Sequence, residues 1–414
     1  MVEPFLPDDA KVAAVRAALP ATGAGIHLDA ATAGPLPAEV AAAMDAVSGR
    51  ELATGRSGPA REEELAERRD EARAAIAALV GGDLERIALT RSTTDGLAAG
   101  VLGLDWRPGD VAVTTSLEHP ALLGLLAAAR ERHGIEVRVV AAAEPGDLAA
   151  AVAAALDDRT RVVACSHVAW TSGARLPVEE IAAAAHDAGA LVVVDGAQAA
   201  GAIRVDPGAL GADLYAFPAR KWLLGPGGVG AAWVGPAALE RLRPVAPGPA
   251  AVARVAAVEA GRLVAPVRWP DARRFDSPGL DGPAVAGAAR ACGWLAMFVG
   301  LDWLADRGGR LARATAERLA ALPGVGVETP RDRMATIVSF RIDGWSAEEA
   351  ADELGARVFA ILRAFPDEGP VRISVGGWAS EAELDRFVAA VAELAAHTPA
   401  TLPPRRRLPI LGDA

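Results

Sequence analysis

The stretch LVVVDGAQ, residues 191–198, followed by AFPARKWLLGPGGVG, residues 216–230, decides the fold. The first stretch opens with an unbroken apolar run rich in valine, which is typical of a short strand buried on both faces of a sheet. That run ends in Asp195, and a carboxylate there is costly to bury unless it has a partner. The second stretch carries Lys221, followed by a tryptophan and a glycine-rich loop.

Around these stretches, strand-like and helix-like segments alternate along the chain. This alternation predicts an α/β fold with a mostly parallel sheet covered by helices on both faces. Such sheets bind ligands at the carboxyl ends of their strands, so we expect the functional residues there. The expected strands are 87–90, 111–115, 137–141, 162–167 and 191–194, and the expected helices between and before them include 61–80, 148–156 and 178–186.

After Arg243 the alternating pattern gives way to Pro/Gly-rich loops that run to about Pro283, and a second unit follows them. It alternates helices and strands in a pattern that predicts a smaller α+β domain. Its expected helices are 284–299, 301–322, 346–353 and 380–396, and its expected strands are 335–342 and 371–375. We therefore predict an N-terminal segment packing on the small domain (1–25), a large domain (26–265), a small C-terminal domain (266–400) and a tail (401–414).

Composition and charge exclude several classes of protein. With a net charge of −11 and a pI near 5.2, the chain is poorly suited to bind nucleic acid, and we interpret the basic run 405–407 as a solvated tail. No apolar run reaches the ~20 residues of a membrane span, and the N-terminus lacks the basic start of a signal peptide. The six histidines show no metal-ligand spacing, so we expect no metal. A cytoplasmic protein is the plain interpretation.

The chain has two cysteines, Cys165 and Cys292, too few for a disulfide framework. The first falls inside an expected buried strand and the second inside an expected helix. We interpret both as structural residues.

Asp195 and Lys221 together suggest a chemistry that neither suggests alone. By itself, Asp195 is compatible with an ordinary turn cap, and Lys221 with a surface residue. The pair suits pyridoxal 5′-phosphate (PLP), because a carboxylate keeps the pyridine nitrogen protonated while a lysine amine forms the Schiff base and later serves as a base.

DGAQ followed by K-W-x-x-G-P-x-G-x-G resembles the class V aminotransferase family of fold-type-I PLP-dependent enzymes. That family includes cysteine desulfurases, cysteine/cystine C–S lyases, isopenicillin N epimerase and kynureninase. The resemblance runs from about His27 to Phe387. It implies a fold-type-I PLP-dependent transferase with a large and a small domain, in which Lys221 and Asp195 are catalytic.

The resemblance also implies roles for residues at other strand ends. Thr93 and Thr94 match the family's phosphate cradle, where helix capping is an alternative or additional role. His119, in SLEHPA, matches a catalytic histidine that stacks on the pyridine ring. Gln198 matches the glutamine that hydrogen-bonds the cofactor's phenolic oxygen, and Thr171 lies in a loop expected beneath the cofactor.

Near the C-terminus, Arg372 matches an arginine that grips the substrate α-carboxylate, although a surface salt bridge is the alternative. Ser277, in RRFDSPG, matches a loop that reaches the partner subunit's phosphate, which implies a homodimer with shared active sites. Three further arginines are candidates to shape the pocket, namely Arg268, Arg274 and Arg363.

The sequence departs from the family pattern in two places. The usual Ser-x-His before the lysine is replaced by 218–220, Pro-Ala-Arg, so one phosphate contact is missing and Arg220 is expected to supply charge instead. No cysteine lies in 343–371, where cysteine desulfurases carry their persulfide nucleophile. Sulfur transfer through a protein persulfide is therefore not expected.

Three segments, SLEHPALLG (116–124), HVAWTSGARLP (167–177) and ARKWLLGPGGVG (219–230), together look most like cysteine/cystine C–S lyases. This resemblance implies a lyase that acts on an amino acid and expels a β-substituent, with sulfur as the leaving atom, from cysteine, cystine or a cysteine conjugate. A class V aminotransferase or an epimerase would use the same cofactor-stabilised carbanion. A non-catalytic PLP-fold binding protein is a further alternative, against which the intact pair of Lys221 and Asp195 argues. The sequence does not identify the substrate.

Overall fold

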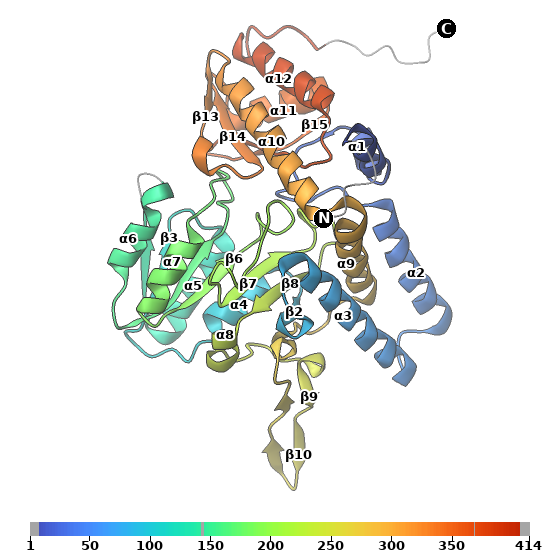
Figure 1. The fold of residues 1–414 in the computed structure, drawn as a ribbon, viewed down its shortest axis with the longest axis vertical. Coiled ribbons are helices and arrows are strands. Elements are labelled where there is room, and N and C mark those ends of the chain that lie inside the picture. Colours follow the sequence, from blue (N-terminus) through green and yellow to red (C-terminus); the bar gives the residue numbers. More distant parts are fainter. Residues whose placement is uncertain (1–7, 142–144, 368, 406–414) are drawn as a thin grey trace.

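The computed structural model describes residues 8–141, 145–367 and 369–405 (Figure 1). Its centre is a seven-stranded sheet with the order β2-β8-β7-β6-β5-β3-β4. All neighbours pair in parallel except β8, which is antiparallel to both β2 and β7, so the prediction of a mostly parallel sheet is confirmed. The strands are β2 (Ile87–Thr90), β3 (Val111–Thr115), β4 (Glu136–Val140), β5 (Thr160–Ser166), β6 (Leu191–Asp195), β7 (Leu214–Pro218) and β8 (Gly230–Val234).

Helices cover both faces of this sheet, because successive side chains of a strand point to opposite faces. On β6, Leu191 and Val193 join one core with helices α4, α5 and α8, whereas Val192 and Val194 join a second core with α3, α6, α7 and α9. Asp195 continues the first series and therefore faces the α4–α5 side. The helices are α3 (Pro59–Val80), α4 (Thr93–Leu102), α5 (Pro120–His133), α6 (Leu148–Ala155), α7 (Val178–Asp187), α8 (Pro236–Arg241) and α9 (Gly282–Trp294).

The second unit is α+β, as predicted, with a four-stranded antiparallel sheet of order β13-β14-β17-β16 and its own core. A short strand near the N-terminus, β1 (Ile26–His27), pairs with β15 (Ala360–Ile361) and so joins this unit. The remaining elements are β13 (Val325–Val327), β14 (Ile337–Ile342), β16 (Arg363–Ala364), β17 (Val371–Ser374), α10 (Leu301–Ala320), α11 (Ala347–Val358) and α12 (Glu381–Ala395).

The boundaries between the large and small units differ from the expected residues 26 and 266. Helix α9 packs against α3 and α2 (Ala38–Thr54) and shares the core of the large sheet, so the small unit begins near Gly300 rather than at residue 266. The window Gly282–Val299 is long and apolar enough by composition to cross a membrane, but 61% of it is buried inside the protein. At the other end, Ile26 lies in the small core although residue 26 was expected to begin the large domain.

The described termini contact the small unit. Helix α1 (Asp8–Ala17) pairs Arg16 with Glu383 of α12, while its Val15 reaches the large core, so the segment bridges the two units. In the expected tail, Arg405 pairs with Glu353 of α11. Residues 406 and 407 of the basic run lie outside the described residues.

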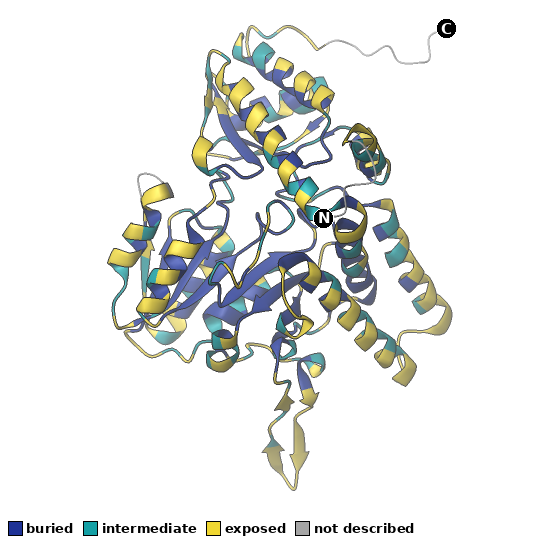
Figure 2. Ribbon diagram, viewed as in Figure 1, coloured by how far each residue is buried: buried dark blue, intermediate teal, exposed yellow. Residues whose placement is uncertain are grey.

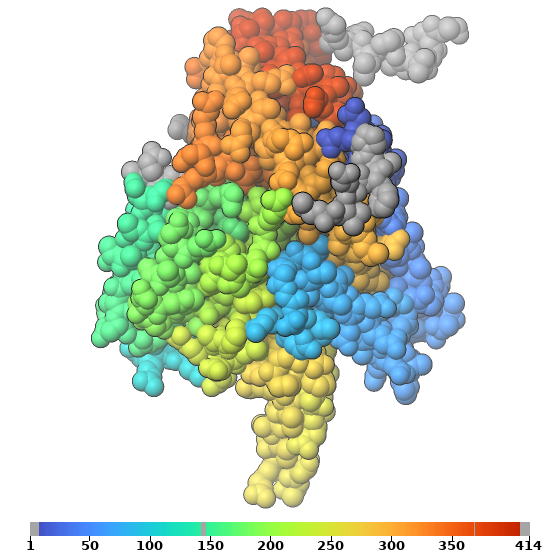
Figure 3. All heavy atoms as spheres, in the orientation of Figure 1, coloured from blue at the N-terminus to red at the C-terminus, as the bar shows by residue number. Residues whose placement is uncertain are grey.

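A hairpin protrudes from the large unit (Figures 1 and 3). Its stem pairs β9 (Val252–Arg254) with β12 (Val267–Arg268), and its tip pairs β10 (Ala257–Glu259) with β11 (Arg262–Val264). The tip is coloured as exposed in Figure 2, whereas the central sheet is buried. An isolated two-stranded hairpin is only marginally stable in water.

Candidate active site

Seven of the ten predicted site residues line one cavity at the carboxyl edge of the large sheet. They come from loops and helix starts that follow different strands, as expected for a site on a parallel sheet. These seven are Thr93, Thr94, His119, Asp195, Gln198, Arg220 and Lys221, and the cavity wall also includes Ser92, Leu97, Ala121, Ser166, Val168, Trp170 and Ala197.

Asp195 ends β6 and is only 6% exposed. Its Oδ1 accepts a hydrogen bond from the backbone N–H of Ala197 at 2.9 Å, and no hydrogen bond from a described residue reaches Oδ2. Burial raises the pKa of Asp195, and the charge of Lys221 opposes this rise. The cavity therefore contains a desolvated carboxylate with an oxygen available to a cationic or N–H donor.

Lys221 lies in the turn after β7 and is 9% exposed. Burial lowers the pKa of its amine to about 8, with Asp195 opposing this shift and Arg220 and Arg372 adding to it. Gly34 abuts the lysine backbone so closely that a Cβ there would lie 2.3 Å from the Lys221 carbonyl oxygen. Near neutral pH, a larger fraction of this amine is therefore neutral and nucleophilic than of an ordinary exposed lysine.

His119 caps a helix and also lines the cavity. Its Nδ1 accepts from Ala121 N–H at 3.1 Å at the start of α5. Its ring meets Trp170 edge-on, with 4.9 Å between centroids, and burial lowers its pKa. Trp170 in turn meets Phe365 edge-on at 5.1 Å, so an aromatic row leads from the cavity toward the small unit.

The start of α4 offers an anion site on the cavity wall. Ser92 caps the helix by accepting from Asp95 N–H at 3.2 Å, and Thr93 and Thr94 occupy the first turn. Backbone N–H groups in a first helical turn have no partner within the helix, and the helix dipole favours negative charge there. A phosphate group fits this position.

Gln198 and Arg220 are already partly engaged by the protein. The Gln198 side chain accepts from Trp222 Nε1 at 3.0 Å and donates to the Ala31 carbonyl at 3.1 Å, which leaves one amide hydrogen for a ligand. Arg220 is exposed and donates from Nε to the Thr32 carbonyl at 3.3 Å.

Arg372 is not on the cavity wall but lies next to it. It is 3% exposed and donates to the Trp170 carbonyl at 2.7 Å and to Asp29 Oδ1 and Thr32 Oγ1 at 3.2 Å each. Its Nε has no partner among the described residues, and its guanidinium lies 5.3 Å from the Phe365 ring centroid. The alternative of a surface salt bridge is wrong, because Arg372 is buried and its partner Asp29 has only 14% of its side chain exposed.

The structure places two other predicted residues away from the cavity. The Thr171 carbonyl accepts from Ser339 Oγ, and its neighbour Trp170 lines the cavity instead. Ser277 donates to Asp95 Oδ2 of its own chain at 3.1 Å. Neither side chain is brought to the cofactor cavity by this single chain.

Of the three further arginines, one lies beside the site. Arg363 is paired with Arg372 across the β16–β17 ladder, and its charge adds to the larger effect of burial in lowering the pKa of Arg372. Arg268 belongs to the hairpin stem, and Arg274 donates to the carbonyls of Leu239, Trp269 and Pro270. These last two do not line the cavity of their own chain.

Sequence reasoning missed Glu118 and Ser166. Glu118 is 3% exposed and lies within the SLEHPA motif beside His119, while Ser166 ends β5 and lines the cavity. The motif was quoted for its histidine, and a serine at a strand end carries no special pattern. Among the described residues, no group of three or more histidine, cysteine or acidic residues could hold a metal.

Both cysteines lie where the sequence placed them, in β5 and in α9, and both are fully buried. Burial raises the pKa of the Cys165 thiol well above its usual value, and that of Cys292 to about 12. Neither thiol is suited to act as a nucleophile.

The residues present fit PLP. The available oxygen of Asp195 suits a protonated pyridine nitrogen, the amine of Lys221 suits an imine to the aldehyde, and the start of α4 suits the phosphate. The fold and this set of residues define a PLP-dependent enzyme.

The aminotransferase class-V family model matches residues 26–370, and the chain belongs to that family. Isopenicillin N epimerase from Streptomyces clavuligerus is 34% identical over 344 residues, which cover 78% of this chain and 83% of that protein. Cysteine desulfurase from Salmonella agona is 29% identical over 75% of this chain and 78% of that protein. A solved complex of the cystine C–S lyase C-DES with its product cysteine persulfide has a TM-score of 0.84 at 27% identity, covering 91% of this chain and 99% of that one.

A second C-DES structure, a variant with glycine covalently linked to its PLP cofactor, has the same TM-score of 0.84 at 26% identity. The fold-type-I architecture, the cofactor and the enzyme class expected from the sequence are thereby confirmed.

Proposed function

We propose that this enzyme is a C–S lyase that eliminates the sulfur substituent from cysteine, cystine or a cysteine conjugate. The observation that carries the proposal is the pair of Lys221 and Asp195 in one buried cavity, in a chain whose two thiols are both fully buried. A desulfurase that passes sulfur to its own cysteine needs a reactive thiol, whereas a lyase does not. The likeness to the cystine C–S lyase C-DES supports the same choice.

Each cavity residue has a role in this proposal. When bound, PLP supplies an electron-accepting ring that stabilises negative charge at the substrate Cα. Asp195 holds the proton on the ring nitrogen, and Lys221, with a pKa of about 8, takes the Cα proton. His119 supports the cofactor ring. Arg372, which donates to the Trp170 carbonyl, attracts the substrate carboxylate.

A second candidate is epimerisation, favoured by the 34% identity to isopenicillin N epimerase. Both activities begin with removal of the Cα proton by Lys221. They differ in the next step, since a lyase expels the β-substituent and an epimerase returns a proton to the opposite face. An aminotransferase would instead protonate the cofactor.

We further propose a cytoplasmic homodimer with shared active sites. The exposed hairpin supports a covering copy, because Val258 and Leu263 are paired across its ladder yet are 74% and 79% exposed. Replacement of both residues by serine is expected to raise the dimer dissociation constant in sedimentation experiments. If the dissociation constant of the dimer does not change, the hairpin does not lie in the interface.

The activity is tested by incubating the PLP-loaded protein with cysteine, cystine and several cysteine S-conjugates. Pyruvate and ammonia, with the cofactor returning to its lysine-bound form, establish elimination. Accumulation of the pyridoxamine form with the β-substituent retained indicates an aminotransferase. Loss of optical activity without elimination indicates an epimerase, and any of these outcomes other than elimination contradicts the lyase.

A further inference from the structure

Glu118 is a buried carboxylate that the proposed chemistry does not use. Its Oε1 accepts from Thr115 Oγ1 at 2.5 Å, and its Oε2 accepts from Ser166 Oγ at 2.6 Å. Burial raises the pKa of Glu118 to about 7, and the nearby charge of Asp195 adds to the rise. Hydrogen bonds from the hydroxyls of Ser166 and Thr115, and from the Ser166 backbone, oppose the rise, whereas no positively charged side chain of a described residue is among the causes of this shift.

Ser166 connects this carboxylate to the cofactor cavity. It is 2% exposed, lines the cavity, and is paired with Asp195 in the parallel β5–β6 ladder. Residues paired in this way lie about 5 Å apart and point to the same face of the sheet. The Ser166 hydroxyl is therefore a neighbour of the Asp195 carboxylate, yet its proton is donated to Glu118.

A serine hydroxyl has a single proton to donate. If that proton turned to Asp195, it would share the carboxylate oxygen that the pyridine nitrogen of PLP requires and would weaken the bond to that nitrogen. A hydrogen bond to an ionised carboxylate is stronger than one to a neutral group, so the competition would be substantial.

We propose that Glu118 is a positioning residue that binds the Ser166 hydroxyl proton and so keeps Asp195 free for the cofactor's ring nitrogen. This inference rests on the PLP cofactor and not on the lyase activity. It explains why a second acid is buried beside Asp195, where charge repulsion disfavours it.

The test is PLP binding by the apoprotein of Glu118→Met, which keeps the length of the side chain and removes both acceptors. We expect its dissociation constant for PLP to rise about tenfold, the effect of one lost charge-assisted hydrogen bond. The pH dependence of the visible absorption band of bound PLP should also change in this variant. The reason is that the Ser166 hydroxyl would then donate to Asp195, which holds the proton on the ring nitrogen.

A double-mutant cycle separates this role from general damage. Ser166→Ala removes the competing hydroxyl and should leave PLP affinity within about threefold of the natural protein, since Asp195 keeps a free oxygen. In the Ser166→Ala background, Glu118→Met should have no further effect on affinity. A matched control is Asp213→Asn. Asp213 is a buried carboxylate immediately before β7 that accepts from Val192 N–H, and its replacement should alter the unfolding midpoint but not PLP binding.

Three outcomes would overturn the proposal. Unchanged PLP affinity in Glu118→Met would show that the hydroxyl does not compete. An equal loss in the presence and absence of Ser166 would assign the effect to charge or packing. A large loss in Ser166→Ala alone would make the serine a direct cofactor contact, and this variant decides the question even if Glu118→Met does not fold.

Discussion

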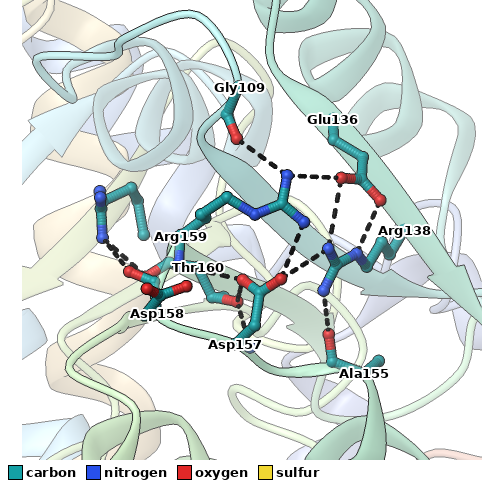
Figure 4. Close-up of polar contacts among 9 residues, drawn as sticks. Gly109, Glu136, Arg138, Ala155, Asp157, Asp158, Arg159 and Thr160 are labelled. Carbon is teal, nitrogen blue, oxygen red and sulfur yellow. Dashed lines mark hydrogen bonds and ion pairs between the residues drawn. The ribbon is translucent and has the colours of Figure 1, made fainter.

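Two clusters of charged side chains in the large unit differ in how their charges are balanced. At the sheet edge, Arg138 of β4 and Arg159 each contact both Glu136 and Asp157, as Figure 4 shows. These pairs are partly or largely exposed, and they lower the pKa of Asp157 and raise that of Arg138. Every charge in this cluster has a partner within the protein.

The cofactor cavity has the opposite arrangement. Burial raises the pKa of Asp195, which has one oxygen without a hydrogen bond from the described residues, and lowers that of Lys221, so burial disfavours the charged form of both groups. The comparison distinguishes two kinds of charged group. Exposed ion pairs have partners within the protein, whereas buried charges without a full set of partners mark a site where a ligand can bind.

The largest expected effect is at the cavity lysine. Lys221→Ala should abolish covalent attachment of PLP and lower activity at least about 10³-fold, because no other group can form the imine and act as base. Borohydride reduction followed by mass spectrometry measures the attachment. The chain offers a matched control, since its one other lysine is Lys11, on α1, and Lys11→Ala should retain full labelling. Cofactor fixed to Lys221→Ala would refute the assignment.

Asp195→Asn should separate function from stability. The amide keeps the bond to Ala197 but cannot hold a proton on the cofactor ring, so we expect activity to fall at least about 100-fold. The apoprotein should become more stable, because a buried charge without a full partner is removed. Calorimetry of the apoprotein measures the unfolding midpoint, and a lower midpoint would contradict this description of the cavity.

The pH dependence of cofactor attachment sharpens the comparison further. The neutral amine of Lys221 reacts with PLP, and its pKa is lowered from 10.5 to about 8. The attachment rate should therefore rise about tenfold per pH unit below pH 7 and level off above about pH 8. Stopped-flow absorbance records this rate, and a rise continuing to pH 10 would mean that the lysine is not desolvated.

The smallest effect is expected in the exposed cluster. Asp157→Asn should leave activity unchanged and shift the unfolding midpoint by no more than about 2 °C, because exposed ion pairs contribute little and are screened by salt. Thermal unfolding at low and high salt measures the shift. A large, salt-independent loss would remove the distinction between the clusters.

Much of the fold followed from the sequence because strand signals were local. The run at 87–90 and the run at 111–115 match β2 and β3, since short apolar runs between helical patterns are distinctive. Which hydrophobic core a helix joins cannot be predicted from a short window of sequence, because it depends on distant segments. Helix α9 follows the loops that seemed to open a new domain, yet its apolar surface packs on α2 and α3.

The same limit applies to the site. Lys221, Asp195 and His119 were found because motifs surround them, and the structure brings them to one cavity. Ser166 was missed because its importance comes from its neighbour in another strand, which is a tertiary fact. Ser277 matched a loop that reaches a partner subunit in the family, and within this chain its hydroxyl donates to Asp95 instead.

The segment 29–34 joins the two basic residues of the site. Thr32 Oγ1 accepts a hydrogen bond from Arg372 at 3.2 Å, and the Thr32 carbonyl accepts one from Arg220, the residue before Lys221, at 3.3 Å. Because both contacts belong to one residue, a shift of this segment would displace the proposed carboxylate-binding arginine and the proposed catalytic lysine together.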